Sequence, residues 1–599
     1  MKYRGPDDEG YFFHDNAALG MRRLSIIDVK GGHQPIYNET GTKCIIANGE
    51  IYNFKQLKQD LLLNKHRFTT NSDTEVILHL YEEYSVECLD KLNGMFAFAV
   101  YDREDGSLFI ARDRLGVKPL YYYFFNGDFV FASELKAILE FPLVEKKIEL
   151  EALNEYFTFE CVPAPRTIYR NIQKLHQGHF LIYKDGQVRI EQYWNASFKE
   201  KVKYSDEECV LRLKDLIDDS VKLRLISDVP LGVFLSGGLD SSLITAFMAR
   251  HAAHKIKTFN ISFEDKSFDE SGYATMASQC LGTEHYEQRL TAEKMLQILP
   301  KVIGFLDEPF ADASIIPTYL LSKFTREKVT VALSGDGGDE LFAGYPTYQA
   351  HRIAGAIPRF SYPLLNFIAN RLPVSDDNIS FDFKLKRILS GNSYPLPARH
   401  QIWLGSFTPE EKKELFLNDI YKQLKVGSDF DIVNYYQNRC DAENSLDRIL
   451  YQDLQLYLQD NMLVKVDRAS MVSSLEVRTP YLDYRIVEFA ASLPSRLKLH
   501  LLTTKYILKR LARGVLPEKI VSRPKKGFGI PVAKWLKCEL REVMHDLLSG
   551  ERIKREGFFN VSYINRLIEE HLSNKKDNRK LLWTLLVFEM WFNKHELNG

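Results

Sequence analysis

The stretch GVFLSGGLDSS, residues 232–242, combines an apolar run, two glycines, hydroxyls and an acid. A buried strand is expected before Ser236-Gly237-Gly238 and a helix near Asp240, so that backbone N–H groups converge on one point. Such a loop binds phosphate, and the Asp240 carboxylate is an oxygen ligand suited to Mg²⁺. A plain glycine turn is the simpler interpretation, but the complete string after a strand favours a phosphate loop. The Walker A pattern G-x-x-x-x-G-K-S/T is absent.

A second stretch, VTVALSGDGGDELFAGY, repeats this plan farther along the chain. An apolar run ends in Ser334-Gly335, and the acids Asp336, Asp339 and Glu340 follow. A solvated acidic turn is the alternative for this loop alone. Two such loops on one sheet would face each other over a shared pocket and supply carboxylates to one metal ion.

The elements that position both loops belong to a domain expected over residues 196–599. It opens with a capping-box signature, Ser205 with Glu208, before a helix. VPLGVFL, KIKTFNISF, HYEQRL and KVTVALS then read as strands separated by helical runs such as SSLITAFMARHA and YATMASQCLG. This alternation predicts an α/β parallel sheet whose ligands lie beyond the carboxyl ends of the strands. Beyond Tyr345 the pattern is mostly helical.

Residues 1–195 predict a separate α+β domain. Apolar or alternating runs, including KCIIANGEIY, GMFAFAVYD and KPLYYYFF, are separated by Gly, Asn and Asp turns. Short strands at this density indicate layered sheets, and SDTEVILHLYEEY adds a helix with a capping box at Ser72 and Glu75. The region is therefore predicted to be a β-sandwich with helices.

Composition limits the classes of partner. Lys and Arg number 79 against 80 Asp and Glu, for a net charge of −1, which gives no global field for nucleic acid or an anionic membrane. The sequence shows neither a spanning apolar run nor a signal peptide, so we expect a cytoplasmic protein. Its seven cysteines form no C-x-x-C pair, which fits reduced thiols.

The motifs resemble those of the ATP-pyrophosphatase family, and specifically of the glutamine-dependent asparagine synthetases. Nearly the whole chain takes part, through SDVPLGVFLSGGLDSS, LSGDGGDELFAGY, DNMLVKVDRASMVSSLEVRTPYLD and SRPKKGFGIP. The resemblance implies adenylation of a carboxylate, the β-carboxylate of aspartate above all, by ATP with Mg²⁺. Ammonia then attacks the acyl-adenylate and yields an amide and AMP.

Roles for individual residues follow from the resemblance. It places Asp336, Asp339 and Lys525 at catalytic positions, and Asp240 with Asp339 at the metal. Lys526 is the competitor of Lys525 in the RPKK run. Asp336 departs from the Glu of well-studied members, which leaves other acceptor carboxylates open. The positions that match the ATP and pyrophosphate pocket are Leu235, Ser236, Gly237, Gly238, Leu239, Asp240, Ser241, Ser242, Ile261, Ser334 and Gly335.

Residues 1–195 resemble the N-terminal-nucleophile glutaminase of the same family, through RRLSIID, ANGEIYN and SDTE. The resemblance implies that an arginine pairs with the α-carboxylate of glutamine, that two acids receive its α-ammonium, and that an amide and a backbone N–H form the oxyanion hole. A surface ion pair is the alternative for Arg23 and Asp73. The matching residues are Arg23, Leu24, Asn48, Gly49, Glu50 and Asp73.

Family members begin with Cys after removal of Met, and its α-amine activates the thiol. Here RGPDDEG begins at Arg4 and Lys2 follows Met1, so the nucleophile is absent from this chain. Cys44 reads as a core residue of a strand. Either the chain is truncated or its glutaminase is degenerate. We favour truncation, because a retained glutamine pocket serves little purpose without a nucleophile, and expect an added segment with an N-terminal Cys to restore glutaminase activity.

Other functions stay open at this point. The acceptor could be a polysaccharide or cell-envelope precursor, or the enzyme could use free ammonia only. The tRNA-modifying ATP pyrophosphatases share SGGxDSS, but neutral charge and the lack of paired cysteines argue against them. A nucleotide-binding pseudo-enzyme is disfavoured by the intact Asp240, Asp339 and Lys525. We expect small-molecule substrates and no nucleic-acid or membrane partner, and leave a homodimer open.

Overall fold

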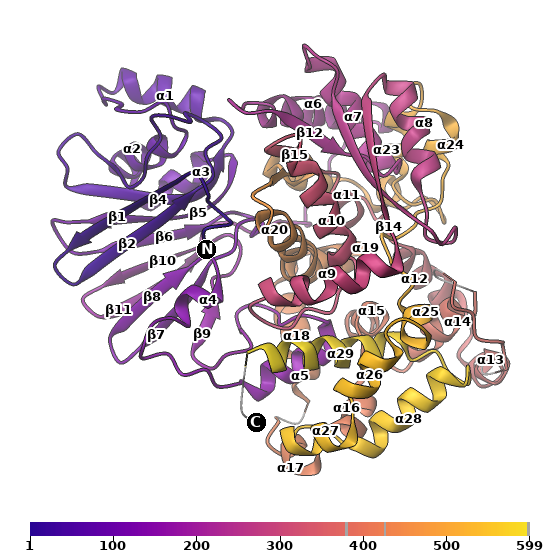
Figure 1. Ribbon diagram of the computed structural model, residues 1–599. Coiled ribbons are helices and arrows are strands. Elements are labelled where there is room, and N and C mark those ends of the chain that lie inside the picture. Colours follow the sequence, from indigo (N-terminus) through magenta and orange to yellow (C-terminus); the bar gives the residue numbers. More distant parts are fainter. Residues whose placement is uncertain (370, 378–380, 425–426, 596–599) are drawn as a thin grey trace.

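The computed structural model describes residues 1–599 apart from 370, 378–380, 425–426 and 596–599. Its first part is a stack of antiparallel sheets with helices, shown in indigo and purple in Figure 1. The strands are β1 (Asp8–His14), β2 (Ala17–Arg23), β3 (Ile36–Tyr37), β4 (Lys43–Ile51), β5 (Gly94–Asp102), β6 (Leu108–Arg112), β7 (Tyr121–Phe125), β8 (Asp128–Ala132), β9 (Ile172–Lys174), β10 (His179–Lys184) and β11 (Gln187–Gln192). The helical segments are α1 (Phe54–Leu63), α2 (Thr74–Tyr84), η1 (Ser85–Glu87), α3 (Cys88–Lys91), α4 (Leu135–Ile138) and α5 (Leu150–Phe159).

A six-stranded sheet in the order β11-β10-β6-β5-β4-β3 forms the centre of this domain. The pair β1-β2 and the three strands β8-β7-β9 form further sheets. One apolar cluster, including Phe12, Ile46 and Tyr122, fills the space between the sheets, and a second, including Phe98 and Leu80, joins the central sheet to α1 and α2. Because both faces of β5 are covered, its sequence GMFAFAVYD is apolar almost throughout.

The start of helix α2 differs from the prediction. Thr74 opens the helix, and the side chain of its N-cap residue, Asp73, makes no capping hydrogen bond. Instead of reaching back to Ser72, the Glu75 carboxylate accepts the backbone N–H groups of Thr69 and Thr70, each at 2.7 Å. The predicted capping box at Ser72 and Glu75 is therefore wrong, because the preceding turn offers Glu75 two donors at once.

The second part contains a five-stranded sheet in which every neighbouring pair is parallel, in the order β14-β13-β12-β15-β16. Its strands are β12 (Leu231–Phe234), β13 (Lys257–Phe263), β14 (Glu284–Leu290), β15 (Val331–Leu333) and β16 (Glu476–Arg478). The antiparallel layers followed by this sheet confirm the predicted fold class. Since β12 and β15 are neighbours, the loops that follow them lie side by side at the carboxyl edge.

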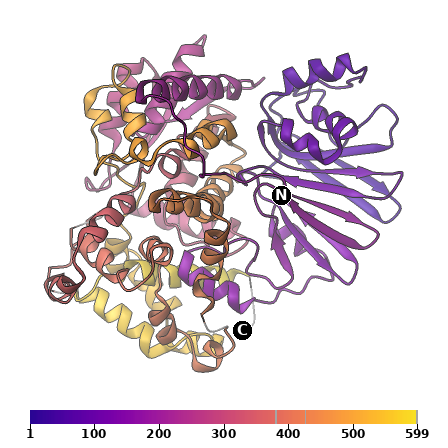
Figure 2. The same ribbon diagram turned by 180° about the vertical axis from the view of Figure 1, so that it is seen from behind.

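Helices surround the parallel sheet and continue to the C-terminus (Figures 1 and 2). Helix α6 (Asp206–Arg224) begins with the predicted capping box of Ser205 and Glu208. Helices near the sheet are α7 (Leu239–His251), α8 (Ser271–Leu281), α9 (Ala292–Phe305), α10 (Ile315–Arg326) and α11 (Gly338–Leu341). Those that follow are α12 (Pro346–Ala356), η2 (Arg359–Ser361), α13 (Tyr362–Ala369), α14 (Phe381–Ser390), α15 (Leu396–Leu404), α16 (Pro409–Leu415), α17 (Asn418–Tyr421), η3 (Ser428–Phe430), α18 (Asp431–Arg439), α19 (Ser445–Gln452), η4 (Asp453–Leu463), α20 (Val464–Met471), η5 (Pro480–Leu482), α21 (Tyr484–Ser492), α22 (Ser495–Lys498), α23 (Tyr506–Ala512), α24 (Glu518–Val521), α25 (Val532–Lys537), α26 (Arg541–Leu547), α27 (Gly550–Glu556), α28 (Val561–Leu572) and α29 (Arg579–Lys594).

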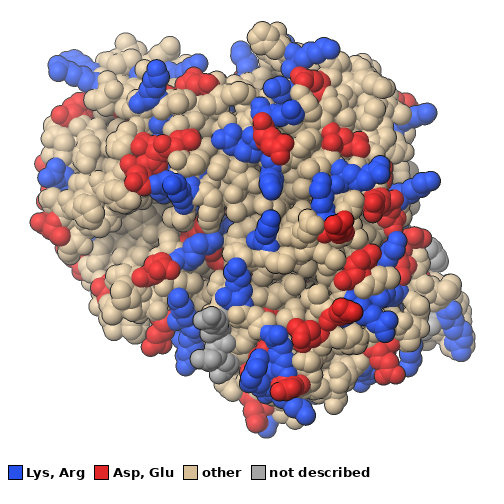
Figure 3. Space-filling model, in the orientation of Figure 1, with Lys and Arg blue, Asp and Glu red and all other residues tan. Residues whose placement is uncertain are grey.

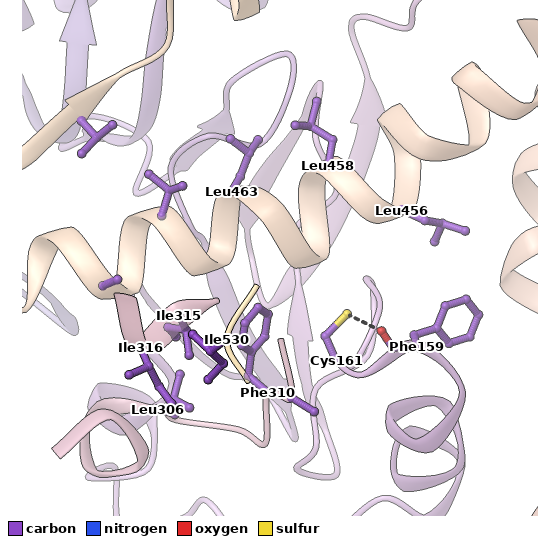
Figure 4. Close-up of a cluster of buried hydrophobic side chains, with 14 of the residues drawn as sticks. Phe159, Cys161, Leu306, Phe310, Ile315, Ile316, Leu456, Leu458, Leu463 and Ile530 are labelled. Carbon is purple, nitrogen blue, oxygen red and sulfur yellow. Dashed lines mark hydrogen bonds between the residues drawn. The ribbon is translucent and has the colours of Figure 1, made fainter. Parts of the chain in front are cut away.

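The main core of this part surrounds the continuous helix formed by η4 and α20. Leu458 and Leu463 belong to that helix, and Phe310, Ile315 and Ile530 belong to the same buried cluster (Figure 4). A helix that is buried nearly all round needs apolar neighbours on several sides. The loop after α9 and the segment before α25 provide them, which fixes the helices behind the two sheet-edge loops.

The two parts are joined by buried polar contacts. Arg4 near the start of the chain lies 2.6 Å from the Asp467 carboxylate on α20. Asn93 donates to Asp483, at 3.0 Å. On the face seen in Figure 3, acidic and basic side chains are interspersed, in keeping with the balanced net charge. Among the described residues, no helix combines the length and apolarity that crossing a bilayer requires.

Candidate active site

The loop after β12 has the predicted strand–loop–helix form. Gly238 is the N-cap of the 13-residue helix α7, whose first residue is Leu239. At Gly237, φ is +67°, and a Cβ would lie 2.2 Å from the backbone carbon of Tyr273, so only glycine fits. Ser236 Oγ accepts the Gly238 N–H at 3.3 Å. The loop therefore presents backbone N–H groups at a helix N-terminus, as a phosphate site requires.

The loop after β15 packs directly against the first. A Cβ at Gly335 would lie 2.9 Å from the backbone nitrogen of Ser241, and one at Gly338 would lie 2.8 Å from the Asp240 carboxylate. Ser334 is anchored from the other side, since its N–H donates to the Arg478 carbonyl of β16 at 2.9 Å. Small residues in the second loop thus permit the close approach that brings its acids to those of the first.

Two lysines converge on the paired acids. The Lys505 ammonium contacts the carboxylates of both Asp240 and Asp339, the latter at 2.6 Å. Lys525 Nζ donates to the other Asp339 oxygen, at 2.6 Å. Burial alone would raise the pKa of Asp339, but the two ammonium groups lower it to about 2. Asp339 is therefore ionised throughout the physiological range.

Lys505 is a site residue that the sequence analysis missed. It is buried, adopts a left-handed backbone with φ of +51°, and precedes helix α23. Its N–H donates to the Phe342 carbonyl at 3.1 Å, which ties it to the second loop. The surrounding TTKYILKR has no motif with a known chemical role, and more than 150 residues separate it from both loops. Only the fold brings it there.

The structure distinguishes the two lysines of the RPKK run. Lys525 points to Asp339, whereas Lys526 Nζ donates to the Asp269 carbonyl at 3.2 Å. Nearby, Arg523 donates to the Gly237 carbonyl at 3.2 Å. The run therefore holds one lysine at the acids, anchors Lys526 to a backbone carbonyl, and anchors Arg523 to a backbone carbonyl and to the Glu270 carboxylate.

A cavity of about 550 Å³, here called the first cavity, opens between the two loops. Three predicted residues do not line it. Gly237 packs its backbone on Tyr273, Ser242 is fully buried in α7, and Ile261 is a core residue of β13. Helix α7 turns Ser242 inward and strand β13 turns Ile261 inward, whereas Gly237 is buried in the loop by the backbone of Tyr273. Predicted residues that do line the cavity are Leu235, Ser236, Gly238, Leu239, Asp240, Ser241, Ser334, Gly335, Asp336, Asp339 and Lys525.

Two further acids lie at this cavity. Asp336 accepts a hydrogen bond from Ser334 Oγ, which fixes the direction of its shorter side chain. Glu340 is buried and accepts the Tyr345 hydroxyl at 2.6 Å. Burial, with the neighbouring Asp339 charge, raises the pKa of Glu340 to about 7. Near neutral pH the cavity therefore holds an acid that retains a proton more readily than the ionised Asp339 beside it.

A second cavity, of about 270 Å³, lies mostly in the antiparallel domain, and Met471 and Glu476 of the second part complete its wall. Gly49 has φ of +146°, and a Cβ there would lie 2.0 Å from the Met95 carbonyl oxygen, so the strand requires glycine. The Asn48 side-chain amide donates to Ser133 Oγ at 3.2 Å. All of the residues predicted to bind glutamine line this cavity, namely Arg23, Leu24, Asn48, Gly49, Glu50 and Asp73.

The charged groups of the second cavity are already engaged with protein partners. Arg23 Nη2 donates to the Ile27 carbonyl at 2.7 Å. Asp73 accepts the Ile51 N–H at 2.7 Å, and burial raises the pKa of Asp73 to about 6. These contacts hold the side chains in place around the cavity.

Glu50 has a partner that the sequence did not predict. Arg478 Nη2 on β16 lies 3.3 Å from the Glu50 carboxylate, across the boundary between the domains. Burial raises the pKa of Glu50 well above its ordinary range, and the nearby Asp73 and Glu476 act in the same direction. Glu50 is thus part of a buried charge cluster between the domains rather than an acid facing only the cavity.

No cysteine among the described residues lines the second cavity. Cys44 is fully buried in β4, within the apolar cluster between the sheets. Burial raises the pKa of its thiol to about 12, so it stays protonated and unreactive. The interpretation of Cys44 as a core residue is confirmed.

Comparisons with known proteins agree with both halves of the chain. A family described as asparagine synthase matches residues 212–593, and one described as a glutamine amidotransferase domain matches residues 1–194. Glutamine-hydrolysing asparagine synthetase 1 of Bacillus subtilis (strain 168) is 36% identical over 599 residues, which cover 100% of this chain and 92% of that protein. Its asparagine synthetase 3 is 30% identical, covering 100% and 95%. A putative asparagine synthetase of Mycobacterium tuberculosis (strain ATCC 25618 / H37Rv) is 31% identical, covering 99% and 92%.

Proposed function

Because this chain belongs to the family of glutamine-hydrolysing asparagine synthetases, which use ATP, we propose that its first cavity amidates aspartate through an acyl-adenylate. A β-carboxylate oxygen of aspartate attacks the α-phosphorus of ATP, and the bond to pyrophosphate breaks. Ammonia then attacks the acyl carbon, a proton leaves the nitrogen, and the bond to AMP breaks. The products are asparagine, AMP and pyrophosphate.

The observation that carries this proposal is the contact between the two sheet-edge loops. Backbone N–H groups at the start of α7 suit the pyrophosphate that leaves. Asp240 and Asp339 meet at one ammonium group beside that helix end. A cavity with backbone N–H donors for an anion, and with carboxylates beside them, suits a nucleotide triphosphate with its cation.

Asp240 and Asp339 fit the Mg²⁺ that accompanies ATP. Asp240 Oδ1 is buried and has no hydrogen-bond partner among the described residues, so a hard oxygen ligand is available there. When bound, Mg²⁺ neutralises charge on the phosphate oxygens. The two carboxylates would hold the ion in place of the Lys505 ammonium that they contact in this structure.

Lys525 is the cation we assign to the developing negative charge at the reacting α-phosphate and acyl groups. Its ammonium is held 2.6 Å from Asp339 at the cavity wall. Desolvation alone would lower the pKa of Lys525, but Asp339 and Asp240 raise it, so the charge is retained. Donors fixed in advance stabilise a transition state without reorganisation.

The second cavity would supply ammonia by holding glutamine. Arg23 and Asp73 are charged groups of opposite sign on its wall, as the α-carboxylate and α-ammonium of an amino acid require. Asn48 and Gly49 would donate to the oxyanion of the glutamine amide. Glu50 would act on the bound glutamine from the cavity wall, where its ion pair with Arg478 holds the carboxylate in place.

The test is the formation of AMP, pyrophosphate and asparagine from ATP, aspartate and ammonia in Mg²⁺ buffer. Lys525→Gln is expected to lower the rate about 10²–10³-fold, the usual effect of losing one transition-state donor. Lys526→Gln is the matched control, because its ammonium binds a backbone carbonyl instead of the acids. Equal losses in both variants would contradict the assignment, and a panel of other carboxylates tests the acceptor.

A further inference from the structure

Four side chains with metal-binding atoms meet on the helical side of the antiparallel domain. Glu39 lies in the hairpin between β3 and β4, His66 follows α1, and His79 and Glu82 lie three residues apart on α2. Their ligand atoms all lie within 4.8 Å of one another. None of the four lines the first or the second cavity, so the cluster belongs to neither proposed substrate site.

Both imidazoles turn the same nitrogen toward one point. His79 Nδ1 lies 3.0 Å from Glu82 Oε2 and 3.6 Å from Glu39 Oε2. His66 Nδ1 lies 3.2 Å from Glu39 Oε1 and 3.9 Å from Glu82 Oε2. The two ring centroids are only 4.7 Å apart. Two nitrogens and two carboxylates therefore surround one small volume.

The opposite nitrogen of each imidazole faces a further carboxylate. His66 Nε2 lies 3.0 Å from Glu83 Oε1, and His79 Nε2 lies 3.7 Å from Glu75 Oε1. A carboxylate behind each histidine is the usual outer arrangement of metal-binding imidazoles, since it fixes the ring and the tautomer. His79 is fully buried, so its orientation is set by this packing.

The carboxylates are also fixed by backbone and side-chain donors. Glu82 Oε1 accepts the Asn38 side-chain amide at 2.6 Å, and Glu39 Oε1 accepts the Arg67 N–H at 2.8 Å. Glu82 thus keeps its other oxygen, Oε2, toward both Nδ1 atoms, whereas Glu39 faces His66 with Oε1 and His79 with Oε2. A donor from another segment holds each of the two acids.

The charges of the cluster are compatible with a divalent cation. In the described part of the chain, every ion pair made by Glu39, Glu75, Glu82 or Glu83 is with one of the two imidazoles. Four carboxylates thus surround two rings that carry at most one positive charge each. A divalent cation bound through neutral imidazoles would bring the same two positive charges as two protonated rings, and would place them on one atom between the carboxylates.

We propose that Glu39, His66, His79 and Glu82 bind one divalent transition-metal ion of the zinc class. Imidazole nitrogen together with carboxylate oxygen suits Zn²⁺, whereas Mg²⁺ and Ca²⁺ prefer oxygen ligands alone. Four protein ligands fit a closed, structural site. The ion would tie the β3–β4 hairpin and the turn after α1 to α2, and so hold the helical layer on the central sheet.

The test uses the full chain, freed of metal by chelation and kept without nucleotide. We expect it to bind one equivalent of Zn²⁺, and Co²⁺ in its place to give the visible absorption of a four-coordinate site. Glu39→Gln combined with His66→Gln should lose that equivalent. Glu83→Gln, a partly exposed residue behind His66, should keep the fold and weaken binding about 10–100-fold.

Two controls separate this site from others. His33→Gln removes an exposed imidazole that is also paired with a carboxylate, and should leave the stoichiometry unchanged. Asp240→Asn should also keep the equivalent, because that acid lies at the first cavity. Loss of zinc in Asp240→Asn, unchanged affinity in Glu83→Gln, or no bound zinc in the unaltered chain would overturn the proposal and leave a hydrogen-bonded cluster of ionised side chains.

Discussion

The two cavities are built by different means. The first is formed by two backbone loops at the carboxyl edge of one sheet, and glycines let those loops touch. The second is formed by side chains on several strands and a helix start, and its buried Glu50 is balanced by Arg478 from the other domain. A loop site depends on local sequence, whereas a side-chain site of this kind depends on how the domains meet.

The contact between Glu50 and Arg478 should matter most for stability. Arg478→Met leaves two buried acids without their cation, and removing one partner of a buried pair costs about 3–5 kcal/mol. Denaturant unfolding measures the loss. Arg496→Met is the control, because its pair with Asp206 is exposed and contributes about 1 kcal/mol or less. Similar losses in both variants would show that the interdomain cluster has no special role.

Asp339→Asn should lower the ammonia-driven reaction of the first cavity, whereas a matching change in the second cavity should not. It removes a charge that two lysines contact, and we expect a 10²–10³-fold loss of AMP formation with saturating ammonia, equal to about 2.7–4 kcal/mol. Asp73→Asn is the counterpart in the second cavity and should leave the ammonia-driven rate unchanged. If both variants lost the rate alike, the two sites would not be independent.

Asp73 should make the stability of the protein around the second cavity depend on pH. Its pKa is raised to about 6 in the fold from an ordinary 3.8, so between these values the folded protein binds a proton that the unfolded chain does not. The contribution of Asp73 to stability therefore falls as pH rises from about 4 to about 6. Asp73→Asn should raise the free energy of unfolding by about 1–3 kcal/mol at pH 7 and by much less at pH 4. An equal gain at both pH values would contradict this.

The smallest effect concerns the helix starts. Ser205→Ala removes the capping box of α6 and should lower the free energy of unfolding by about 1 kcal/mol. Ser72→Ala should cost less, because α2 has no such box and Ser72 Oγ accepts only the Thr74 N–H, at 3.2 Å. Equal costs would mean that the two helix starts are stabilised to the same extent.

The sequence predicted what local patterns determine. Alternation of strands and helices was sufficient for the parallel sheet, and both glycine-rich loops were placed correctly on its edge. The capping box of α6 was predicted because all of its partners lie within four residues. In each case the physical cause is contained in a short window of the chain.

What the sequence did not predict depends on distant parts of the chain. Lys505 reaches its site from a segment without a recognised motif. Arg478 lies in a stretch that resembles the family, but its contact with Glu50 joins strands far apart in the chain, and β16 has only three residues, two of them charged. The predicted box at Ser72 failed because the preceding turn offered Glu75 better donors. Competition among distant partners is decided by packing, which a local pattern does not contain.

The central claim is that the first cavity forms an acyl-adenylate. We would incubate the protein with ATP, Mg²⁺, ammonia and aspartate carrying ¹⁸O in its β-carboxylate, and measure the mass of each phosphate product. The account predicts one ¹⁸O atom in the phosphate of AMP and none in pyrophosphate. Label in inorganic phosphate or pyrophosphate, or asparagine formed with unlabelled AMP, would contradict it.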